Sequence, residues 1–331
     1  MTRSDWVDRN LYPFESHYID VDGGRMHYVD EGTGPVVVLV HGTPTWSFLY
    51  RSLIRDLSRD HRVIALDHIG FGLSDKPAQW SYRPGDHARN LETLIERLAL
   101  RDVTLIVHDF GGPIGLSYAT RHPENVRALV LFNTWLWSLE GTPAEKLSRF
   151  MAGGIGRFLY TRLNFSPKVI IKAAFGDKSK LTREVHRHYI SVFPTSSERQ
   201  APWMLAKELI GSSDWYTSLW NQRERFAGKP SLVLWGMKDP AFKADALARW
   251  TSTLTSAHVV QFPRCRSLRA GRSTGAGRAR GETLSGDAVC VIVARALVTE
   301  AGAWARARLG SSDFIVQFPL CDCAAQQYAA T

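Results

Sequence analysis

The chain has 331 residues, 44% of them hydrophobic and 22% charged, which is ordinary for a soluble globular protein of one or two domains. Its polar N-terminus and the lack of a long apolar run predict neither a signal peptide nor a membrane span, so we expect a cytoplasmic protein. The net charge of +9 permits an acidic partner, but it is unevenly spread. From Arg264 onward the chain has no lysine or histidine and holds all four cysteines, so its two parts differ in composition.

Strands with short connections are predicted along the first part of the chain. Two alternating segments, 17–21 and 25–30, flank Asp22-Gly23-Gly24 and predict a β-hairpin. Further apolar patterns predict buried strands at 35–40 and 62–67 and helices at 47–57 and 84–100.

A strand, a sharp turn and a helix are predicted around Asp109. The apolar run 103–107 predicts a fully buried strand, and Gly111-Gly112 open a helical segment. Taken alone, an aspartate after a strand is more often a cap or turn residue than a reactive one. With a further strand at 126–132, the alternation of strands and helices favours an α/β fold whose mostly parallel sheet has helices on both faces.

A helical insertion is predicted between two strands of this sheet. Residues 134–225 lose the strand pattern and are rich in aromatic side chains. We expect most of these side chains to form the core of a cap and a few to line an apolar pocket. The sheet resumes near Pro230, with a helix at 245–254 and a strand from His258. The expected division is 1–133 and 226–263 for the core, 134–225 for the cap and 264–331 for a non-matching, poorly ordered tail.

Four motifs of the chain stand out: His41-Gly42-Thr43-Pro44-Thr45-Trp46, the turn from Asp67 to Pro77, His108-Asp109-Phe110-Gly111-Gly112 and Gly236-Met237-Lys238-Asp239. Together they resemble the motifs of the haloalkane dehalogenases, which are α/β-hydrolases with an aspartate nucleophile. The resemblance covers about residues 15 to 263 and implies the α/β-hydrolase fold. It also implies that a carboxylate displaces halide from an sp3 carbon and that a histidine, oriented by a second carboxylate, activates water to hydrolyse the alkyl ester. Neither a cofactor nor a metal is implied.

The resemblance assigns roles to particular residues. Asp109 matches the nucleophile, which should be ionised at neutral pH without a base. Asp239 matches the acid that orients the histidine, and the backbone N–H groups of Thr43 and Phe110 match the oxyanion hole. Asn133 stands where some members have a glutamate and cannot serve as that acid, and His41 is expected to be structural.

Two departures from the family pattern concern the leaving group. The family has a tryptophan directly after the nucleophile, but Phe110 has no side-chain donor. Thr43 stands where the family usually has asparagine or another polar residue that contacts the halide, and Trp46 or a cap tryptophan is a candidate donor. Epoxide hydrolases share the aspartate and use cap tyrosines as donors, which leaves that activity open. The candidate tyrosines are Tyr160, Tyr189 and Tyr216, although packing is the more frequent role for each.

A third departure is the missing histidine. The family has it shortly after the last strand, whereas no histidine follows His258 in this chain. One permitted set of codons for the segment from Arg266 to Ser273, read one base later, gives Gly-His-Phe-Val-Gln-Glu-Glu. Arg264-Cys265 in the same way gives Asp-Ala. We therefore hypothesise a single-base insertion near Pro263; the alternative is a genuine C-terminal extension.

The chain as written is expected to begin a reaction that it does not finish. Asp109 should form an alkyl ester with a small haloalkane or epoxide, and without the histidine the ester should persist, unless the shortened core misfolds. A non-catalytic ligand-binding relative is the other class of function left open. We expect no nucleic-acid, membrane or zinc partner, since the C-terminal arginines are scattered and Cys321 and Cys323 have no matching pair. The expected state is a monomer or a simple homo-oligomer.

Overall fold

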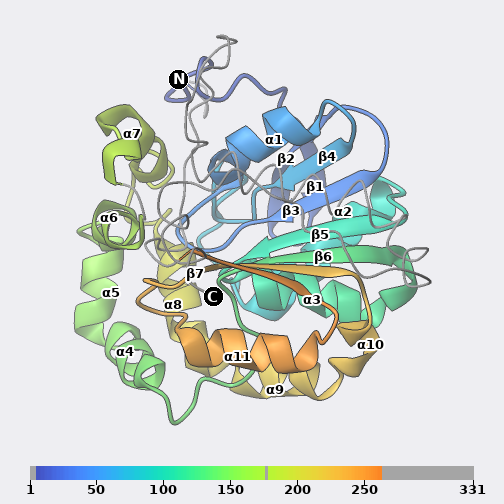
Figure 1. The fold of residues 1–331 in the computed structure, drawn as a ribbon. Helices are drawn as coiled ribbons and strands as arrows, with labels where there is room; N and C mark the ends of the chain where they lie inside the picture. The colour runs from blue at the N-terminus through green and yellow to red at the C-terminus, as the bar shows by residue number, and fades with distance from the viewer. Residues whose placement is uncertain (1–4, 176–177, 263–331) are drawn as a thin grey trace, which may run out of the picture.

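One sheet organises the computed structural model, which describes residues 5–175 and 178–262 (Figure 1). Eight strands follow one another across the sheet in the order β1-β2-β4-β3-β5-β6-β7-β8. Their bounds are β1 (His17–Val21), β2 (Gly24–Glu31), β3 (Val36–Val40), β4 (Arg62–Leu66), β5 (Val103–His108), β6 (Val126–Phe132), β7 (Ser231–Gly236) and β8 (His258–Phe262). The pairs β1·β2 and β2·β4 are antiparallel, and every pair from β4 to β8 is parallel. This mostly parallel sheet confirms the predicted α/β architecture.

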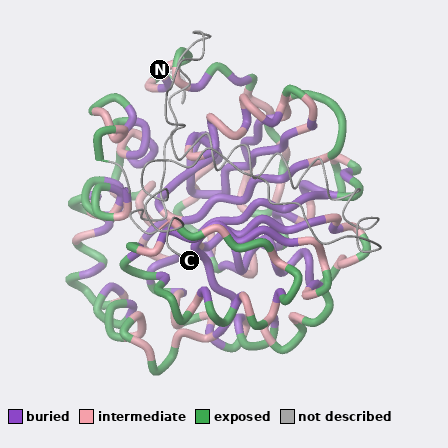
Figure 2. The backbone as a smooth tube through the Cα atoms, in the orientation of Figure 1, coloured by how far each residue is buried: buried purple, intermediate pink, exposed green. Residues whose placement is uncertain are grey.

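The centre of the sheet is buried on both faces. Strands β5 and β7 are buried at every residue, and β3 and β4 at all but their first (Figure 2). Their sequences are rich in valine, leucine and isoleucine, as expected for parallel strands with helices on both faces. The edge strand β8 is different, because none of its residues is fully buried and the Val259 side chain is 37% exposed.

Four helices lie against the sheet. They are α1 (Arg51–Leu57), α2 (Pro84–Arg97), α3 (Gly111–Arg121) and α11 (Ala244–Thr253). Figure 1 shows α1 above the sheet and α3 and α11 below it. Helix α2 ends three residues earlier than the predicted 84–100, because Ala99 takes a left-handed conformation (φ +49°) that stops the helix. The predicted helix 47–57 begins as a short 3₁₀ turn, Ser47–Tyr50, before α1.

The segment between β6 and β7 is helical, as predicted. It contains α4 (Pro143–Ala152), α5 (Gly154–Thr161), α6 (Ile171–Ala174), α7 (Arg183–Ile190), α8 (Gln200–Gly211), α9 (Ser213–Asn221) and α10 (Glu224–Ala227). Helices α4, α5 and α8 pack on one another, whereas α9 and α10 contact α3 beneath the sheet. The cap boundary at 225 stays a prediction. Because α9 contacts α3 beneath the sheet, a boundary before α9, near Ser212, is favoured.

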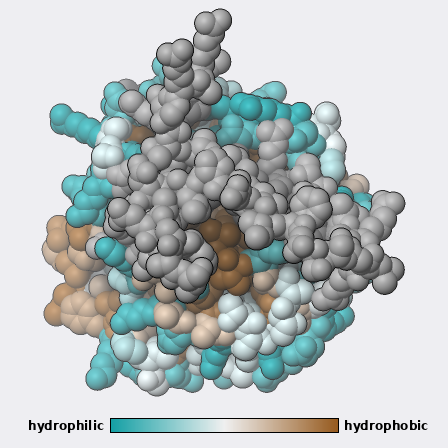
Figure 3. Space-filling view, in the orientation of Figure 1, coloured by the Kyte–Doolittle hydropathy of each residue, from teal (hydrophilic) through white to brown (hydrophobic). Residues whose placement is uncertain are grey.

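The outer surface of the cap is partly apolar. Helices α4 and α5 expose Leu147, Phe150, Ile155 and Phe158 by half or more. Figure 3 shows a brown, apolar area at the left, over the part of the cap where these helices lie. Among the residues that the structure describes, no helix is long and apolar enough to cross a membrane.

Candidate active site

Asp109 lies at the sharp turn between β5 and α3, where the sequence predicts it. Its backbone is in the left-handed region (φ +53°), which a residue with a side chain adopts at a cost. Hydrogen bonds hold this conformation: the Asp109 amide donates to the Asn133 carbonyl (3.2 Å), and the Asp109 carbonyl accepts from Thr134 Oγ1 (2.6 Å). The turn therefore presents the carboxylate at the carboxyl end of the sheet.

Glycines leave the space that the Asp109 carboxylate and its turn need. A Cβ atom on Gly42 would lie 2.3 Å from Asp109 Oδ1, and one on Gly111 would lie 2.0 Å from the Val40 carbonyl oxygen. Such distances are far below van der Waals contact. The Gly42 position and the turn glycine are thus required by close approach rather than by backbone flexibility.

The Asp109 carboxylate is held by backbone amides. The Thr43 amide donates to Asp109 Oδ1 (2.9 Å), and the Phe110 amide also hydrogen-bonds to the carboxylate. Burial raises the pKa of Asp109 to about 7, against the lowering effect of these amides, and the charge of Asp239 raises it further. Asp109 is therefore only partly ionised at neutral pH in this structure, where the sequence predicts an ionised carboxylate, because sequence alone does not register the burial.

The loop that carries Thr43 is fixed by two side chains. His41 Nδ1 lies 2.8 Å from the Gly42 carbonyl, and His41 Nε2 accepts from the His68 amide (3.0 Å). Both ring nitrogens are thus occupied, which supports the structural role expected for His41. Asp67 Oδ1 accepts from the Ser47 amide (2.8 Å), which ties the β4 turn to the beginning of the helix after this loop.

Asp239 follows β7 in a tight turn and is almost fully buried. Its Oδ1 accepts from the amides of Ala241 (2.7 Å) and Phe242 (2.9 Å). Asp109 and Asp239 follow parallel strands at the same end of the sheet, and the charge of Asp239 contributes to the raised pKa of Asp109. The expected histidine position, the segment Arg266–Ser273 and the cysteines Cys265, Cys290, Cys321 and Cys323 lie outside the described residues.

Asn133 connects the ends of β6 and β7. Its Nδ2 donates to the Gly236 carbonyl (3.1 Å), and its Oδ1 accepts from the Gly236 amide (2.8 Å). This pair of bonds gives Asn133 a structural role beside the turn that holds Asp239.

Trp46 is not available as a leaving-group donor. Its Nε1–H donates to the carbonyl of His188 (3.2 Å), and its ring packs against Tyr12 and Phe48. The acceptor of the Trp46 N–H is distant in sequence, so the loop motif alone could not show that this donor is already paired.

The three candidate tyrosines differ in their surroundings. Tyr216 donates its hydroxyl to the Glu208 carbonyl (3.0 Å), and the Tyr189 ring lies edge-on to Phe48. Burial raises the pKa of Tyr160 to about 12, against a hydrogen bond with Ser166, and the charge of Asp109 contributes in the same direction as burial. The charge of Asp109 also contributes to the raised pKa of Tyr216, so the phenols of both Tyr160 and Tyr216 lie within electrostatic reach of the candidate nucleophile.

Two further residues beside Asp109, Trp135 and Thr134, were not singled out from the sequence as site residues. The Trp135 ring meets Phe110 edge-on, with ring centroids 4.8 Å apart and an interplanar angle of 82°. Its indole Nε1–H is buried without a hydrogen-bond partner, and so is the hydroxyl of Thr43. Thr134 holds the Asp109 carbonyl through its hydroxyl. The signal in the sequence was the position of Thr134-Trp135 directly after the strand next to β5.

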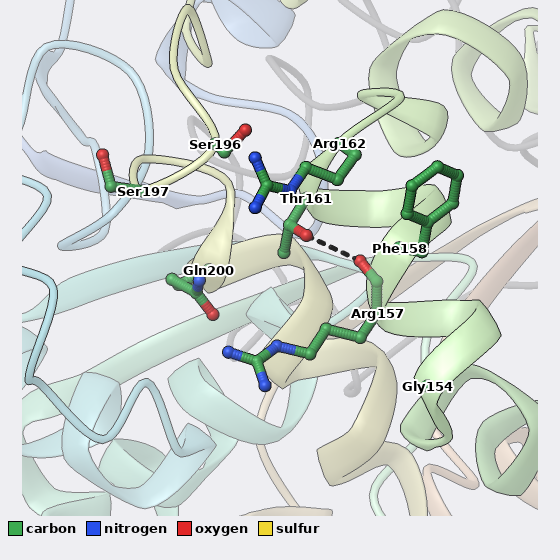
Figure 4. A pocket seen from close by; sticks show the side chains of 8 residues that line it. All are labelled: Gly154, Arg157, Phe158, Thr161, Arg162, Ser196, Ser197 and Gln200. Atoms are coloured by element: carbon green, nitrogen blue, oxygen red, sulfur yellow. Dashed lines mark hydrogen bonds between the residues drawn. The ribbon is translucent and has the colours of Figure 1, made fainter.

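A separate cavity of about 480 Å³ lies on the cap, away from Asp109 (Figure 4). It opens between α5 and the beginning of α8. Its lining is mostly polar, and consists of Gly154, Arg157, Phe158, Thr161, Arg162, Ser196, Ser197 and Gln200. None of the residues that hold the Asp109 carboxylate belongs to it.

Comparison with known proteins gives one consistent family. The α/β hydrolase fold family matches residues 35–266. Haloalkane dehalogenase 2 of Mycobacterium bovis is 36% identical over 258 residues, which cover 77% of this chain and 90% of that protein. A cis-3-alkyl-4-alkyloxetan-2-one decarboxylase of Shewanella oneidensis is 33% identical and covers 77% of this chain and 83% of its own length. The crystal structure of haloalkane dehalogenase DbeA from Bradyrhizobium elkani has the same fold, with a TM-score of 0.75 at 23% identity over 88% of this chain and 99% of that one.

Proposed function

We propose that this chain, which belongs to the haloalkane dehalogenase family of the α/β-hydrolases, attacks carbon–halogen bonds with Asp109 as the nucleophile. The observation that carries the proposal is the Asp109 carboxylate itself. It stands at a strained turn with Oδ1 fixed by the Thr43 amide, and we assign the attack to Oδ2. The substrate is a small haloalkane, and water is the second reactant.

The first step is a displacement at an sp3 carbon. Asp109 Oδ2 forms a bond to carbon while the carbon–halogen bond breaks, and the bonding pair leaves with the halide. Oδ1 then becomes the carbonyl oxygen of the alkyl ester. Because the amides of Thr43 and Phe110 already point at the carboxylate, they are placed to stabilise negative charge on that oxygen when water attacks the ester.

The second step needs a base that removes a proton from water. Asp239 is the carboxylate that would orient a histidine for this purpose, and no histidine follows His258 in the chain. We therefore expect the ester at Asp109 to accumulate. A full turnover would release alcohol, halide and a proton.

Intact-mass spectrometry after incubation with 1-bromobutane tests this function. The expected result is one butyl group per chain, located by peptide mapping at Asp109, with one equivalent of bromide released. Asp109→Asn is the matched control and should carry no adduct. Repeated bromide release at ordinary enzymatic rates would overturn the stalled ester, and the absence of both adduct and bromide would overturn Asp109 as the nucleophile.

A second candidate reaction comes from the decarboxylase relatives. An oxetan-2-one also offers a strained bond between oxygen and an sp3 carbon to a carboxylate nucleophile. The 33% identity with the Shewanella oneidensis decarboxylase supports testing this substrate class. Incubation with a cis-3,4-dialkyloxetan-2-one, followed by measurement of carbon dioxide, would distinguish it from dehalogenation.

Epoxide hydrolysis and ligand binding without chemistry can be tested on the same site. The charge interaction between Tyr160 and Asp109 supports the former, since the phenol could protonate an epoxide oxygen. Formation of a hydroxyalkyl adduct that Tyr160→Phe abolishes would favour epoxide hydrolysis. Tight reversible binding of small apolar compounds with no adduct would favour a non-catalytic function. A cytoplasmic monomer or simple homo-oligomer remains our proposal for the state of the protein.

The composition change at Arg264 supports the proposed frame change. The decisive measurement is the nucleotide sequence around Pro263. Codons that give Gly-His-Phe in the adjacent frame would support the hypothesis, and any others would exclude it.

A further inference from the structure

The exposed apolar side chains of this protein are concentrated on the cap. Of the eight large hydrophobic side chains that are exposed in the described part of the chain, six belong to residues 143–172. They are Leu147, Phe150, Ile155, Phe158, Leu163 and Val169. Figure 1 shows α4, α5 and α6 one after another along one edge of the molecule, and Figure 3 shows an apolar area there. Apolar side chains that are grouped in this way indicate an interaction surface, whereas scattered ones need no explanation.

Basic residues alternate with these apolar side chains. Residues 143–172 hold six basic residues, all exposed, and one acidic residue, a net charge of +5 (6 − 1). The acidic residue, Glu145, pairs with Arg149 (2.7 Å). Five of the six apolar residues directly follow a lysine or an arginine, in the pairs Lys146-Leu147, Arg149-Phe150, Arg157-Phe158, Arg162-Leu163 and Lys168-Val169. The exposed side chains of residues 143–172, which we call the cap-edge surface, therefore present apolar groups and cations side by side.

The cap cavity of about 480 Å³ adjoins the cap-edge surface. Phe158 lines the cavity and is also one of the exposed apolar residues. Figure 4 shows Arg157 and Arg162 extending toward Ser196 and Gln200, with Phe158 turned to the other side. None of the eight lining residues is acidic. The cavity is thus a polar, cationic recess at the border of an apolar surface.

The walls of this recess are held by other parts of the cap. The Arg199 guanidinium donates to the carbonyls of Phe193 (2.9 Å) and Arg162 (3.0 Å), which joins the loop before α8 to the end of α5. The Arg157 guanidinium lies over the Trp203 ring, 5.2 Å from its centroid. Because the recess is already formed, an anion can bind there at a small cost in conformational entropy.

The charge of the cap-edge surface discriminates between two kinds of occupant. A second copy of this chain would bring two like surfaces of net charge +5 together, and like charges across an interface are unfavourable. An anionic phospholipid surface instead supplies the opposite charge in its headgroups and an apolar layer beneath them. Long basic side chains beside apolar ones suit this boundary, because their charge stays at the headgroups while the apolar neighbours enter the acyl region.

We propose that the cap-edge surface is a docking site for anionic phospholipid membranes, with the arginines of the adjoining cavity binding headgroup phosphates. The apolar side chains of α4 and α5 then enter the boundary between headgroups and acyl chains. Binding to the face of a membrane needs no spanning segment, so the lack of a long apolar run in the sequence does not oppose it. This inference goes beyond the proposed function and does not depend on it.

The test is flotation of the full chain with vesicles of equal parts phosphatidylcholine and phosphatidylglycerol, with vesicles of phosphatidylcholine alone as the reference. We expect binding to the anionic vesicles and not to the neutral ones, and a loss of binding as sodium chloride is raised. Ile155→Ser with Phe158→Ser should weaken binding about tenfold or more, because two exposed apolar side chains no longer leave water. Arg157→Gln with Arg162→Gln should weaken it about 25-fold, since each basic residue near an anionic surface contributes about fivefold.

Two matched controls change the same kinds of residue outside the cap-edge surface. Val259→Ser removes an exposed apolar side chain from β8, and Arg225→Gln removes an exposed arginine from α10. Both should leave vesicle binding unchanged. A second readout needs no substitution and so does not depend on the folding of a variant: a photoactivatable phospholipid in the anionic vesicles should cross-link to peptides from residues 143–172.

Three results would overturn the inference. The first is no binding to the anionic vesicles; because flotation does not use the reaction at Asp109, this failure is distinct from a failure of the proposed function. The second is binding that both double variants leave unchanged, with cross-links in residues 264–331, which would assign it to the C-terminal segment. The third is a dimer in sedimentation that Ile155→Ser with Phe158→Ser converts to a monomer, without vesicle binding, which would make a second copy the occupant.

Discussion

Strands β5 and β8 lie in the same sheet, but they differ in burial and in the part of the site that follows each of them. Every residue of β5 is buried, and the turn after it is fixed by hydrogen bonds from two other segments. Strand β8 lies at the edge with no residue fully buried, and the histidine that the family has after this strand is absent from the chain. The part of the site that forms the ester is thus built into the centre of the sheet, while the part that would hydrolyse it depends on what comes after Phe262.

The largest effect should come from supplying the missing part of the site that hydrolyses the ester. We predict that replacing 264–273 with Asp-Ala-Gly-His-Phe-Val-Gln-Glu-Glu converts a single release of bromide into repeated turnover, because Asp239 can then orient a histidine. Continuous halide release measures the effect. The same replacement with alanine in place of its histidine is the control and should stop after one equivalent. Absence of turnover in both would show that the motif alone does not complete the site.

A substitution that displaces the nucleophile after β5 should have an effect almost as large. Gly42→Ala places a Cβ atom where Asp109 Oδ1 now lies, so the carboxylate must move. A displacement of about 1 Å at a reacting group costs about 10²-fold in rate, and we expect alkylation by 1-bromobutane to fall by that order. Gly228→Ala adds a methyl group where no atom lies within 4 Å and serves as the control. Unchanged alkylation in Gly42→Ala would contradict the close packing of Gly42 on the carboxylate.

The pH dependence should report the burial of Asp109. Only the ionised carboxylate attacks, so the alkylation rate should fall about tenfold per pH unit below about 7 and level off above it. The midpoint follows from mass-spectrometric rates between about pH 5 and 9. A midpoint near 4 would mean that the carboxylate is solvated.

The same raised pKa has a consequence for stability. The folded state holds the Asp109 proton to about pH 7 while the unfolded chain releases it near pH 4, so unfolding becomes more favourable as the pH rises through this window. Asp109→Asn removes the buried charge. We therefore expect it to be more stable than the unsubstituted protein at pH 8, by up to about 4 kcal/mol, and not at pH 4. Chemical denaturation at the two pH values measures the difference, which should vanish if Asp109 ionises freely.

The smallest effect should come from Asp239 in the chain as it stands. Asp239→Asn removes a charge that raises the pKa of Asp109, so alkylation at pH 6 should rise a few-fold while the rate at pH 8 stays the same. The amide oxygen of asparagine can still accept the bonds from Ala241 and Phe242. A fall in the rate at both pH values would instead indicate that Asp239 supports the turn.

The sequence predicted the features that are encoded locally. The Asp109 turn follows from an apolar run, one polar residue and two glycines, and the structure has the same strand, turn and helix. The misjudged features depend on distant contacts. The Trp46 N–H donates to the carbonyl of His188, 142 residues away in the sequence, and the pKa of Asp109 depends on the elements that bury it. Trp135 gains its neighbours, Phe110, Tyr216 and Phe242, from three separate segments. The end of α2 rests on a left-handed alanine, for which the sequence has no signal.

The bridge between Asn133 and Gly236 bears on how this fold can vary. The chain leaves the sheet after β6 and returns at the adjacent strand β7, and the Asn133 side chain joins the two ends directly. The sheet thus closes the intervening loop itself, and lengthening a loop whose ends are already held costs little entropy. Helices α4 to α8 can therefore be exchanged, shortened or redesigned for another substrate while the nucleophile keeps its place, so specificity and chemistry can evolve as separable traits.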